Sequence, residues 1–364
     1  MRNSLNDIQQ HGQSVWYDNL SRGLIQSGEL SRLIDLGVTG LTSNPTIFQK
    51  AIVGSDEYDD AFESLVRQGK DADGIYEGLV IEDIRSAADL LRPVYENTKG
   101  ADGYASLEVN PHLAHDTAGT VVEAKRLFAE LDRPNVMIKV PATPAGMPAI
   151  HYLIGEGINV NVTLLFSLKA YSDARQAYIA GLEDLKLSGE DLAGVASVAS
   201  FFVSRVDTAI DTRLDDKAPE LRGRAAVANA KLAYRDFQED FGRERFSVLQ
   251  QAGARVQRPL WASTGVKNSA YSDVLYIESL IGENTVNTMP ETTLLAFLEH
   301  GTADDTISKD VDVAAKLIDD VEATGVAMNE ITSGLLSNGV KLFSDSFDEL
   351  MADIERKRRM LVKD

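Results

Sequence analysis

The sequence predicts an α/β protein that folds as one (β/α)8 barrel domain over residues 1–364, with additional helices in the connections and at the C-terminus. Short apolar runs rich in β-branched residues alternate with longer stretches of helical periodicity, and about eight such pairs follow one another. The apolar runs are nearly continuous, which is typical of parallel strands buried on both faces. An open doubly wound sheet is the alternative. However, no Gly-x-Gly-x-x-Gly follows the first strand, and the motif Gly-x-x-x-x-Gly-Lys-[Ser/Thr] is absent.

Eight segments are expected to form the strands. They are Ser14–Asn19, Gly37–Ser43, Ala105–Val109, Val136–Val140, Ile158–Phe166, Val195–Val203, Pro259–Ser263 and Asn284–Asn287. The last of these has the weakest signal. A minimal barrel needs about 250 residues, and the chain has 364. The surplus is expected in long helical connections, between Asn44 and Ser106 and between Asp207 and Arg258, and in C-terminal helices.

Helical periodicity fills the segments between the strands. Apolar residues recur at i, i+3, i+4 and i+7 from Tyr58 to Val66 and again from Ile84 to Leu91. Further helices are expected at Ala170–Leu185, at Ala225–Phe241, at Thr292–His300 and in the tail, where the stripe is Val340, Phe343, Phe347, Leu350, Met351 and Ile354. The simplest interpretation of each stripe is packing against the core.

The composition excludes several classes of protein. Hydrophobic residues make up 44% of the chain and charged residues 25%, so a large core can form. The absence of cysteine excludes disulfide scaffolds, thiolate metal sites, Fe–S clusters and cysteine nucleophiles. With 36 basic and 56 acidic residues the formal charge is −20, which argues against binding to nucleic acid or an anionic membrane. The polar N-terminus and the lack of an apolar run of roughly 18 residues lead us to expect a cytoplasmic protein.

Polar residues interrupt the apolar runs at the ends of the predicted strands, where barrel enzymes have their active sites. In chain order they include Asp18, Thr42, Asn44, Glu108, Lys139, Asn161, Thr163, Ser200, Arg205, Ser263 and Lys267. The carboxyl ends of all the strands meet on one face of a barrel. We therefore expect these side chains to converge on one site.

Lys139 is the most informative of these residues. Apolar neighbours flank it in Met137–Val140, so its ammonium is expected to be partly desolvated. Desolvation disfavours the charged form and favours the neutral amine, which attacks carbonyl groups. The alternative is a structural lysine paired with a carboxylate such as Glu108 or Asp18. The acids, amides, hydroxyls and cations at neighbouring strand ends exceed what one ion pair needs, and they suit carbinolamine formation, dehydration and C–C cleavage.

Arg205, Ser263 and Lys267 follow the sixth and seventh predicted strands. Barrel enzymes often bind phosphate close to this point, in the loops after strands seven and eight. Glycine lets backbone N–H groups approach an anion, and arginine and lysine supply positive charge. Taken alone, each of the three residues is also compatible with a solvated or ion-paired role.

Five motifs occur in order along the chain. They are Gly40–Phe48 (GLTSNPTIF), Ile138–Thr143 (IKVPAT), Asn159–Ser167 (NVNVTLLFS), Ser200–Val206 (SFFVSRV) and Trp261–Asn268 (WASTGVKN). Together they resemble the transaldolase family, from about Val15 to Asp353, and the chain length resembles its larger bacterial subgroup. The resemblance implies a (β/α)8 class I aldolase of the pentose phosphate pathway. Such an enzyme moves a dihydroxyacetone unit from sedoheptulose 7-phosphate to glyceraldehyde 3-phosphate, giving erythrose 4-phosphate and fructose 6-phosphate.

The resemblance also implies roles for individual residues. By position, Lys139 resembles the Schiff-base lysine, and Asp18 resembles the acid/base that takes the C4 hydroxyl proton. Glu108 and Thr163 resemble the pair that holds the water used in Schiff-base formation and hydrolysis. The residues that match the substrate-binding set are Asn44, Asn161 and Ser200 for the dihydroxyacetone hydroxyls, Arg205 and Ser263 for the phosphate, Phe202 for the shape of the pocket, and Thr42 and Lys267 beside them.

The chain departs from the family pattern at two positions. Many members have an arginine two residues after the serine that matches Ser263, whereas this chain has Gly265 there and Lys267 two residues further on. Lysine is a point charge and cannot make the bidentate contact of arginine, so the role of Lys267 at the phosphate is an open question. Ser204 stands where a glycine is frequent.

The resemblance implies no cofactor and no metal. Only His112 and His115, followed by Asp116, have a spacing typical of metal ligands. The basic run Arg356–Arg359 is interpreted as the end of a C-terminal helix, where cations complement the helix dipole, rather than as a nucleic-acid site. The expected partners are sugar-phosphate substrates, with no nucleic acid and no membrane, and the chain is expected to be a monomer or a homodimer.

Two other functions are compatible with the same residues. A fructose-6-phosphate aldolase would release free dihydroxyacetone, but such aldolases are shorter and tend to carry a glutamine where this chain has Glu108. A catalytically silent barrel would bind phosphosugars or a protein partner without turnover.

Overall fold

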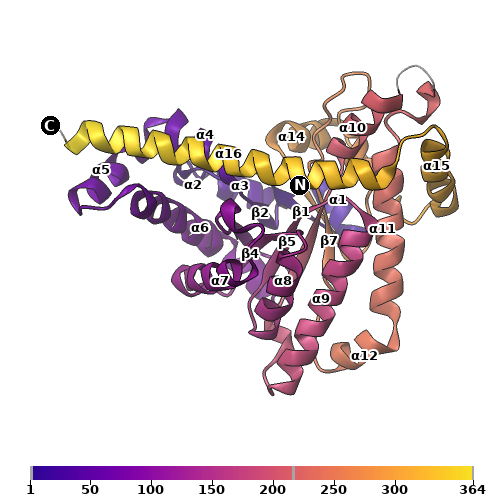
Figure 1. Ribbon diagram of the computed structural model, residues 1–364, viewed down its shortest axis with the longest axis horizontal. Coiled ribbons are helices and arrows are strands. Elements are labelled where there is room, and N and C mark those ends of the chain that lie inside the picture. Colours follow the sequence, from indigo (N-terminus) through magenta and orange to yellow (C-terminus); the bar gives the residue numbers. More distant parts are fainter. Residues whose placement is uncertain (1–2, 215–217, 363–364) are drawn as a thin grey trace.

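A computed structural model describes residues 3–214 and 218–362. Its eight strands pair in parallel and close into a barrel in the order β1 to β8, which confirms the predicted (β/α)8 fold (Figure 1). The strands are β1 (Gln13–Tyr17), β2 (Gly40–Thr42), β3 (Ala105–Glu108), β4 (Val136–Pro141), β5 (Val160–Leu165), β6 (Ser197–Phe202), β7 (Arg258–Ala262) and β8 (Thr285–Met289). From β2 to β6 and in β8 every strand residue is buried, as the apolar runs predict.

Each predicted strand overlaps the observed one, but several are shorter than predicted. The predicted segment Ile158–Phe166 becomes a strand over Val160–Leu165, because the apolar residues on either side are buried outside the hydrogen-bonded ladder. This strand is also irregular. Its register against β6 shifts between Val162 and Leu165, and Leu164 has a φ of 60°. Such a bulge turns side chains to new directions at the end of a strand.

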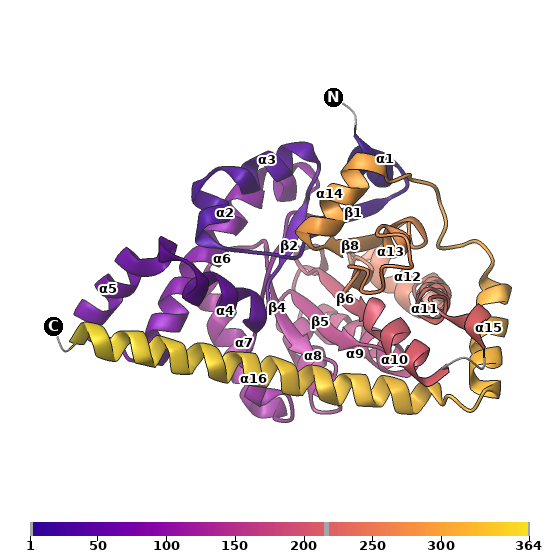
Figure 2. The same ribbon diagram turned by 90° about the horizontal axis from the view of Figure 1, so that it is seen from above.

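Helices cover the outside of the barrel (Figures 1 and 2). They are α1 (Ser4–Gln10), α2 (Arg22–Gln26), α3 (Glu29–Leu36), α4 (Pro45–Gly54), α5 (Asp59–Arg67), α6 (Ala72–Asn97), α7 (Thr117–Leu131), α8 (Gly146–Gly155), α9 (Leu168–Leu187), α10 (Ser204–Leu214), α11 (Ala225–Gly242), α12 (Glu244–Gln251), α13 (Leu275–Glu278), α14 (Glu291–His300), α15 (Val311–Ala323) and α16 (Met328–Val362). All six predicted helical stretches lie in helices, and the long connection after Asn44 contains α4, α5 and α6.

Several short helices were not predicted, because they span too few turns to show a repeating pattern of apolar residues. The seven-residue α1 is defined at its start by a capping box, in which the Asn3 side chain accepts from the backbone of Leu5 and Asn6 and the Asn6 side chain accepts from the Asn3 backbone. Only Leu5 and Ile8 of this helix are buried. Capping chemistry, rather than apolar spacing, was the available signal here.

The C-terminal helix α16 runs along one side of the barrel mouth, from the region of α15 to the region of α5 (Figure 2). It contacts α4, where the Thr46 and Ser346 hydroxyls lie 2.9 Å apart, and α6, where Tyr76 packs edge-on against Phe347. It also packs closely on β5. A Cβ at Gly339 would lie 2.9 Å from Leu164 Cδ2, so glycine permits this approach. These contacts hold α16 against the end of the barrel at which the strands terminate.

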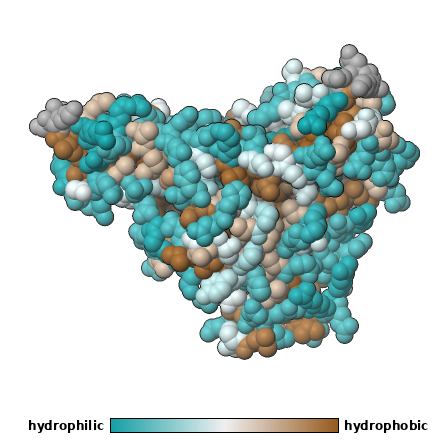
Figure 3. All heavy atoms as spheres, in the orientation of Figure 1, coloured by the Kyte–Doolittle hydropathy of each residue, from teal (hydrophilic) through white to brown (hydrophobic). Residues whose placement is uncertain are grey.

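The basic run near the C-terminus lies in the last turns of α16, as predicted. Its side chains pair with acids: Lys357 with Asp59, Arg356 with Asp353, and both Arg358 and Arg359 with Glu355. The face in Figure 3 is largely hydrophilic, with apolar side chains in small groups. Among the helices of residues 3–214 and 218–362, none combines the length and apolar character needed to cross a membrane.

Candidate active site

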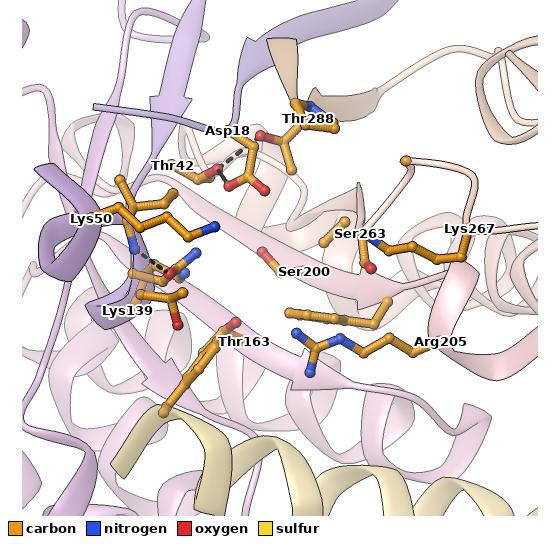
Figure 4. A pocket seen from close by; sticks show the side chains of 18 residues that line it. Asp18, Thr42, Lys50, Lys139, Thr163, Ser200, Arg205, Ser263, Lys267 and Thr288 are labelled. Atoms are coloured by element: carbon orange, nitrogen blue, oxygen red, sulfur yellow. Dashed lines mark hydrogen bonds between the residues drawn. The ribbon is translucent and has the colours of Figure 1, made fainter. Parts of the chain in front are cut away.

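A cavity of about 300 Å³ lies where the barrel strands end (Figure 4). Ten of the twelve candidate residues line it: Asp18, Thr42, Asn44, Lys139, Thr163, Ser200, Phe202, Arg205, Ser263 and Lys267. Glu108 and Asn161 lie behind its wall. The convergence follows from the parallel strands, since residues that follow β1 and β7 reach the same face as residues within β4, β5 and β6.

Lys139 reaches the cavity from the middle of β4. The alternation along the strand directs it into the barrel, and its residue exposure is 5%. Its Nζ donates a hydrogen bond to the Ser43 carbonyl at 2.9 Å and lies 3.4 Å from Glu108 Oε2. Glu108 is the residue directly opposite Lys139 in the β3–β4 ladder. The amine therefore has a carboxylate partner and also borders the cavity, so both interpretations of this lysine describe part of its environment.

Asp18 follows β1 and faces Lys139 across the cavity (Figure 4). Thr42 Oγ1 donates to Asp18 Oδ1 at 2.7 Å, and Thr288 Oγ1 lies 2.8 Å from the same hydroxyl. The surrounding protein desolvates the carboxyl and raises the pKa of Asp18, although the Thr42 hydrogen bond and the charges of Lys139 and Arg205 oppose this shift. Such a carboxylate is suited to accept and return a proton.

Glu108 and Thr163 lie on opposite sides of Lys139 in the barrel wall. Burial raises the pKa of Glu108, and the charge of Lys139 opposes that effect. Within the described part of the chain, neither Glu108 Oε2 nor Thr163 Oγ1 has a hydrogen-bond partner, and both atoms are buried. Buried polar atoms normally have partners, so these two have unused capacity for a small polar ligand.

Asn161 lies one layer below Thr163 on β5 and is fully buried. Its amide donates to Ser106 Oγ at 3.1 Å, and Ser200 Oγ donates to its carbonyl oxygen at 2.7 Å. Asn161 thus orients Ser200, which does line the cavity. Asn44 has a different constraint: it is the N-cap of α4, and its Oδ1 accepts from the Ile47 N–H at 3.0 Å. This contact leaves the Asn44 NH2 group available to the cavity.

Two cations, Arg205 and Lys267, lie on the side of the cavity away from Lys139, with Ser263 beside them (Figure 4). Arg205 is half-buried, its guanidinium carbon lies 5.3 Å from the centre of the Phe202 ring, and burial lowers its pKa. In residues 3–214 and 218–362, neither cation forms an ion pair. Ser263 has a φ of 54°, and its hydroxyl lies 3.0 Å from that of Ser204. Unpaired cations beside hydroxyls suit an anionic group such as phosphate.

Further residues of the cavity were absent from the sequence-based set. They are Thr46, Ile47 and Lys50 of α4, Ala262, Gly265, Thr288, Pro290 and Phe343. Lys50 could have been found, because Asn44, Ile47 and Lys50 are spaced by one helical turn after a strand end. Phe343 could not, since it lies on α16 and its apolar stripe indicates only burial. Lys50 is exposed and lies on the Lys139 side of the cavity (Figure 4).

No cluster of three or more His, Cys, Asp or Glu side chains suited to a metal ion occurs within the residues that the structure describes. Of the two histidines at the metal-like spacing, His112 has its Nε2 2.7 Å from Asp348 Oδ1 of α16.

Comparisons with known proteins point to one family. A family model described as transaldolase/fructose-6-phosphate aldolase matches residues 15–354. Transaldolase 2 of Streptomyces coelicolor is 48% identical over 367 residues, which covers 99% of this chain and 99% of that protein. The transaldolase of Thermobifida fusca is 48% identical over 96% of this chain and 97% of its own length. That of Trichodesmium erythraeum is 44% identical over 99% and 98%, respectively.

Proposed function

The chain belongs to the transaldolase/fructose-6-phosphate aldolase family, and from this we propose the reaction that it performs. It is an enzyme that transfers aldehyde or ketone groups. In the proposed reaction a dihydroxyacetone unit moves from sedoheptulose 7-phosphate to glyceraldehyde 3-phosphate through a Schiff base on Lys139. The products are erythrose 4-phosphate and fructose 6-phosphate, as in the pentose phosphate pathway, and the expected location is the cytoplasm.

The observation that supports this most strongly is the environment of Lys139. Its amine is buried, borders a cavity of about 300 Å³, and has the Glu108 carboxylate 3.4 Å from its nitrogen. Once the amine has lost a proton, its lone pair can attack the C2 carbonyl of a ketose held in the cavity. The carbonyl oxygen then leaves as water, and Glu108 is the nearest carboxyl group to the amine that could supply or remove the protons.

Cleavage of the C3–C4 bond requires a base for the C4 hydroxyl and a sink for the bonding electrons. The iminium on Lys139 takes the electron pair. Asp18 is the carboxylate that lines the cavity among the described residues, and its raised pKa matches a group that both accepts and returns a proton. Asn44, Ser200 and Thr42 offer hydrogen bonds to the hydroxyls of the three-carbon unit.

The phosphate would lie at the opposite side of the cavity, against Arg205, Ser263 and Lys267. Anchoring this end fixes the distance of C2 from Lys139 and of C4 from Asp18, which is the positioning that accelerates such steps. After the first aldose leaves, the three-carbon unit must wait for the acceptor. Phe343 of α16 lines the cavity, and its apolar ring would limit the access of water to the waiting unit.

The test is reduction with borohydride in the presence of fructose 6-phosphate, followed by mass spectrometry, together with a coupled assay of fructose 6-phosphate and erythrose 4-phosphate turnover. The wild-type chain should gain one reduced dihydroxyacetone or ketose adduct on Lys139, and Lys139→Met should lose both the adduct and turnover. Lys50→Met is the matched control, because this lysine also lines the cavity. It should still form the adduct.

A wild-type chain that forms no adduct, or a Lys139→Met chain that keeps turnover, would contradict the proposal. Measuring free dihydroxyacetone with and without an acceptor aldehyde separates transfer from the fructose-6-phosphate aldolase reaction. Transfer predicts little free dihydroxyacetone without the acceptor. Tight binding of sugar phosphates without turnover would instead indicate a catalytically silent barrel.

A further inference from the structure

Two separate segments of the chain build the phosphate end of the active-site cavity. Arg205 belongs to α10, whereas Ser263 and Lys267 belong to residues 263–274, which connect β7 to α13 and form the β7 loop (Figure 4). Lys267 and the three residues after it are exposed. Groups from two segments can bind one anion together only if the segments keep a fixed relative position. The contacts between α10 and the β7 loop therefore bear on phosphate binding.

One face of α10 contacts the β7 loop and α13. Ser204, Asp207 and Asp211 are spaced i, i+3 and i+7, so their side chains share this face. The Ser204 N–H donates to the Ser263 carbonyl at 3.0 Å, and the hydroxyl oxygens of the two serines lie 3.0 Å apart. Ser263 has a φ of 54°, a conformation that persists in a serine only where the surroundings hold it. The first turn of α10 thus fixes Ser263 directly.

Two tyrosines extend this contact beyond Ser263. The Tyr271 hydroxyl donates to Asp211 Oδ2 at 2.7 Å, and the Tyr276 hydroxyl, from α13, donates to Asp207 Oδ2 at 2.8 Å. Burial and the neighbouring carboxylates raise the pKa of both tyrosines, so each hydroxyl keeps its proton and acts as the donor. The β7 loop is therefore held to α10 on both sides of its exposed stretch.

The other oxygen of each carboxylate is bound as well. Asp207 Oδ1 accepts from the Ala226 N–H of α11 at 2.7 Å, and Asp211 Oδ1 accepts from the Gly223 N–H at 3.0 Å. The Tyr271 ring packs against Gly223, where a Cβ would lie 2.6 Å from Tyr271 Cζ. Backbone donors thus fix the direction of both carboxylates, and each carboxylate offers its tyrosine one defined position.

Asp207 is retained at a cost to the fold. Its residue exposure is 1%, and burial raises its pKa to about 6. An ionised carboxylate whose pKa is raised in the folded protein destabilises the fold at neutral pH. Stability alone therefore does not account for this residue, whereas a role at the neighbouring binding site does.

We propose that the face of α10 formed by Ser204, Asp207 and Asp211 sets the affinity of the enzyme for phosphorylated sugars. None of these three residues lines the cavity, so they are positioning residues: they hold the β7 loop, with its Lys267, within reach of the phosphate that Arg205 binds. The inference rests on the proposed function, since it assumes a sugar phosphate in the cavity. Because the phosphate is remote from the reacting carbons, a loosened loop should weaken binding and leave the chemical steps unchanged.

The test compares fructose 6-phosphate with unphosphorylated fructose, using saturating glyceraldehyde as an acceptor without phosphate. The double variant Tyr271→Phe/Tyr276→Phe removes both hydroxyl contacts and keeps both rings. It should raise KM for fructose 6-phosphate about fivefold, as expected for the loss of one or two neutral hydrogen bonds, and leave kcat within about twofold. Activity with fructose should stay within about twofold of wild type. Ser204→Ala should raise the same KM about twofold, and it serves if the double variant folds poorly.

Tyr178→Phe is the matched control. Tyr178 is fully buried, and its hydroxyl donates to the Arg255 carbonyl at 2.7 Å, at the end of β7 away from the cavity. This variant also loses one buried tyrosine hydroxyl contact. It should lower thermal stability and leave KM for fructose 6-phosphate unchanged.

A second measurement separates positioning from general support of the fold. In a Ser263→Ala/Lys267→Met background the two tyrosine substitutions should change KM by less than about twofold, because they act through the groups already removed. The same factor in both backgrounds, an equal loss with fructose, or an unchanged KM in the tyrosine and Ser204 variants would overturn the positioning role. A wild-type chain that neither forms the borohydride adduct nor turns over fructose 6-phosphate would instead overturn the proposed function, so the two failures are distinguishable.

Discussion

The two cations at the phosphate end of the cavity should contribute unequally to substrate binding. Arg205 is half-buried, stacks on Phe202, and has no ion pair within the described residues, so its charge is fully available to a ligand. A hydrogen bond to a charged group contributes about 1.5–3 kcal/mol. Arg205→Met should therefore lower kcat/KM for fructose 6-phosphate by about 10- to 150-fold, at roughly 1.4 kcal/mol per factor of ten.

Lys267 is exposed, and its ammonium is a strongly hydrated point charge at the rim of the same cavity. Exposed ion pairs contribute about 0.2–1 kcal/mol. Lys267→Met should thus cost only about 1.5- to 5-fold in kcat/KM, and the loss should shrink further at high ionic strength because solvent ions screen the pair. Comparing the loss of kcat/KM in Lys267→Met with that in Arg205→Met decides whether this lysine takes the place of the arginine found in many family members.

The assay compares fructose 6-phosphate with unphosphorylated fructose at a fixed, saturating acceptor concentration. Both variants should affect the phosphorylated substrate and leave the activity with fructose within about twofold, since the cations act on the phosphate. Equal losses with both substrates would show that Arg205 supports the cavity wall rather than the phosphate. A larger loss from Lys267→Met than from Arg205→Met would refute the reasoning from burial.

Further predictions concern the carboxylate and the walls of the cavity. Asp18→Asn should lower kcat by about 10²- to 10⁴-fold, because the base is lost. The same variant should raise Tm. The pKa of Asp18 is raised in the folded protein, so the ionised carboxylate destabilises the fold at neutral pH, and the neutral amide removes that cost. Thr42→Val removes a hydrogen bond that lowers the pKa of Asp18, so this pKa should rise by about one unit. The acid limb of the pH profile of kcat/KM, on which the carboxylate protonates, should move to higher pH by the same amount. Gly265→Arg adds a cation beside the phosphate end of the cavity and should lower KM for fructose 6-phosphate about fivefold. The new Cβ would lie 3.2 Å from Pro290 Cγ, so Pro290 must shift slightly to accept it. Phe343→Leu should increase the release of free dihydroxyacetone relative to transfer, measured without acceptor, and an unchanged ratio would show that this side chain does not exclude water.

The barrel was predictable because burial on both faces leaves nearly continuous apolar runs, and a strand of the structure overlaps every one of them. The ends of the strands were harder to predict. Ile158 and Phe166 are as buried as the strand between them, but they lie outside its ladder, and composition cannot distinguish burial in a strand from burial beside it. Short helices such as α1 depend on capping side chains, which leave no periodic pattern.

The convergence of Asp18, Lys139 and Thr163 on one cavity was also predictable, since all parallel strands end on the same face. The layer of the barrel in which each strand residue lies was not predictable. Asn161 and Thr163 share a face of β5, but only Thr163 lines the cavity, whereas Asn161 binds Ser106 and Ser200 one layer below. The layer that a strand residue occupies depends on the stagger of the barrel, which arises from long-range pairing.

The apolar stripe of α16 illustrates the same limit and has a functional consequence. Spacing identifies Phe343 and Phe347 as a buried face, and core packing is the simplest interpretation of such a face. The structure confirms that both side chains are buried, and it also places Phe343 in the lining of the cavity that contains Lys139. A helix that begins almost 200 residues after Lys139 thereby borders the candidate active site. Changes at Phe343 should therefore act on the partition between transfer and hydrolysis.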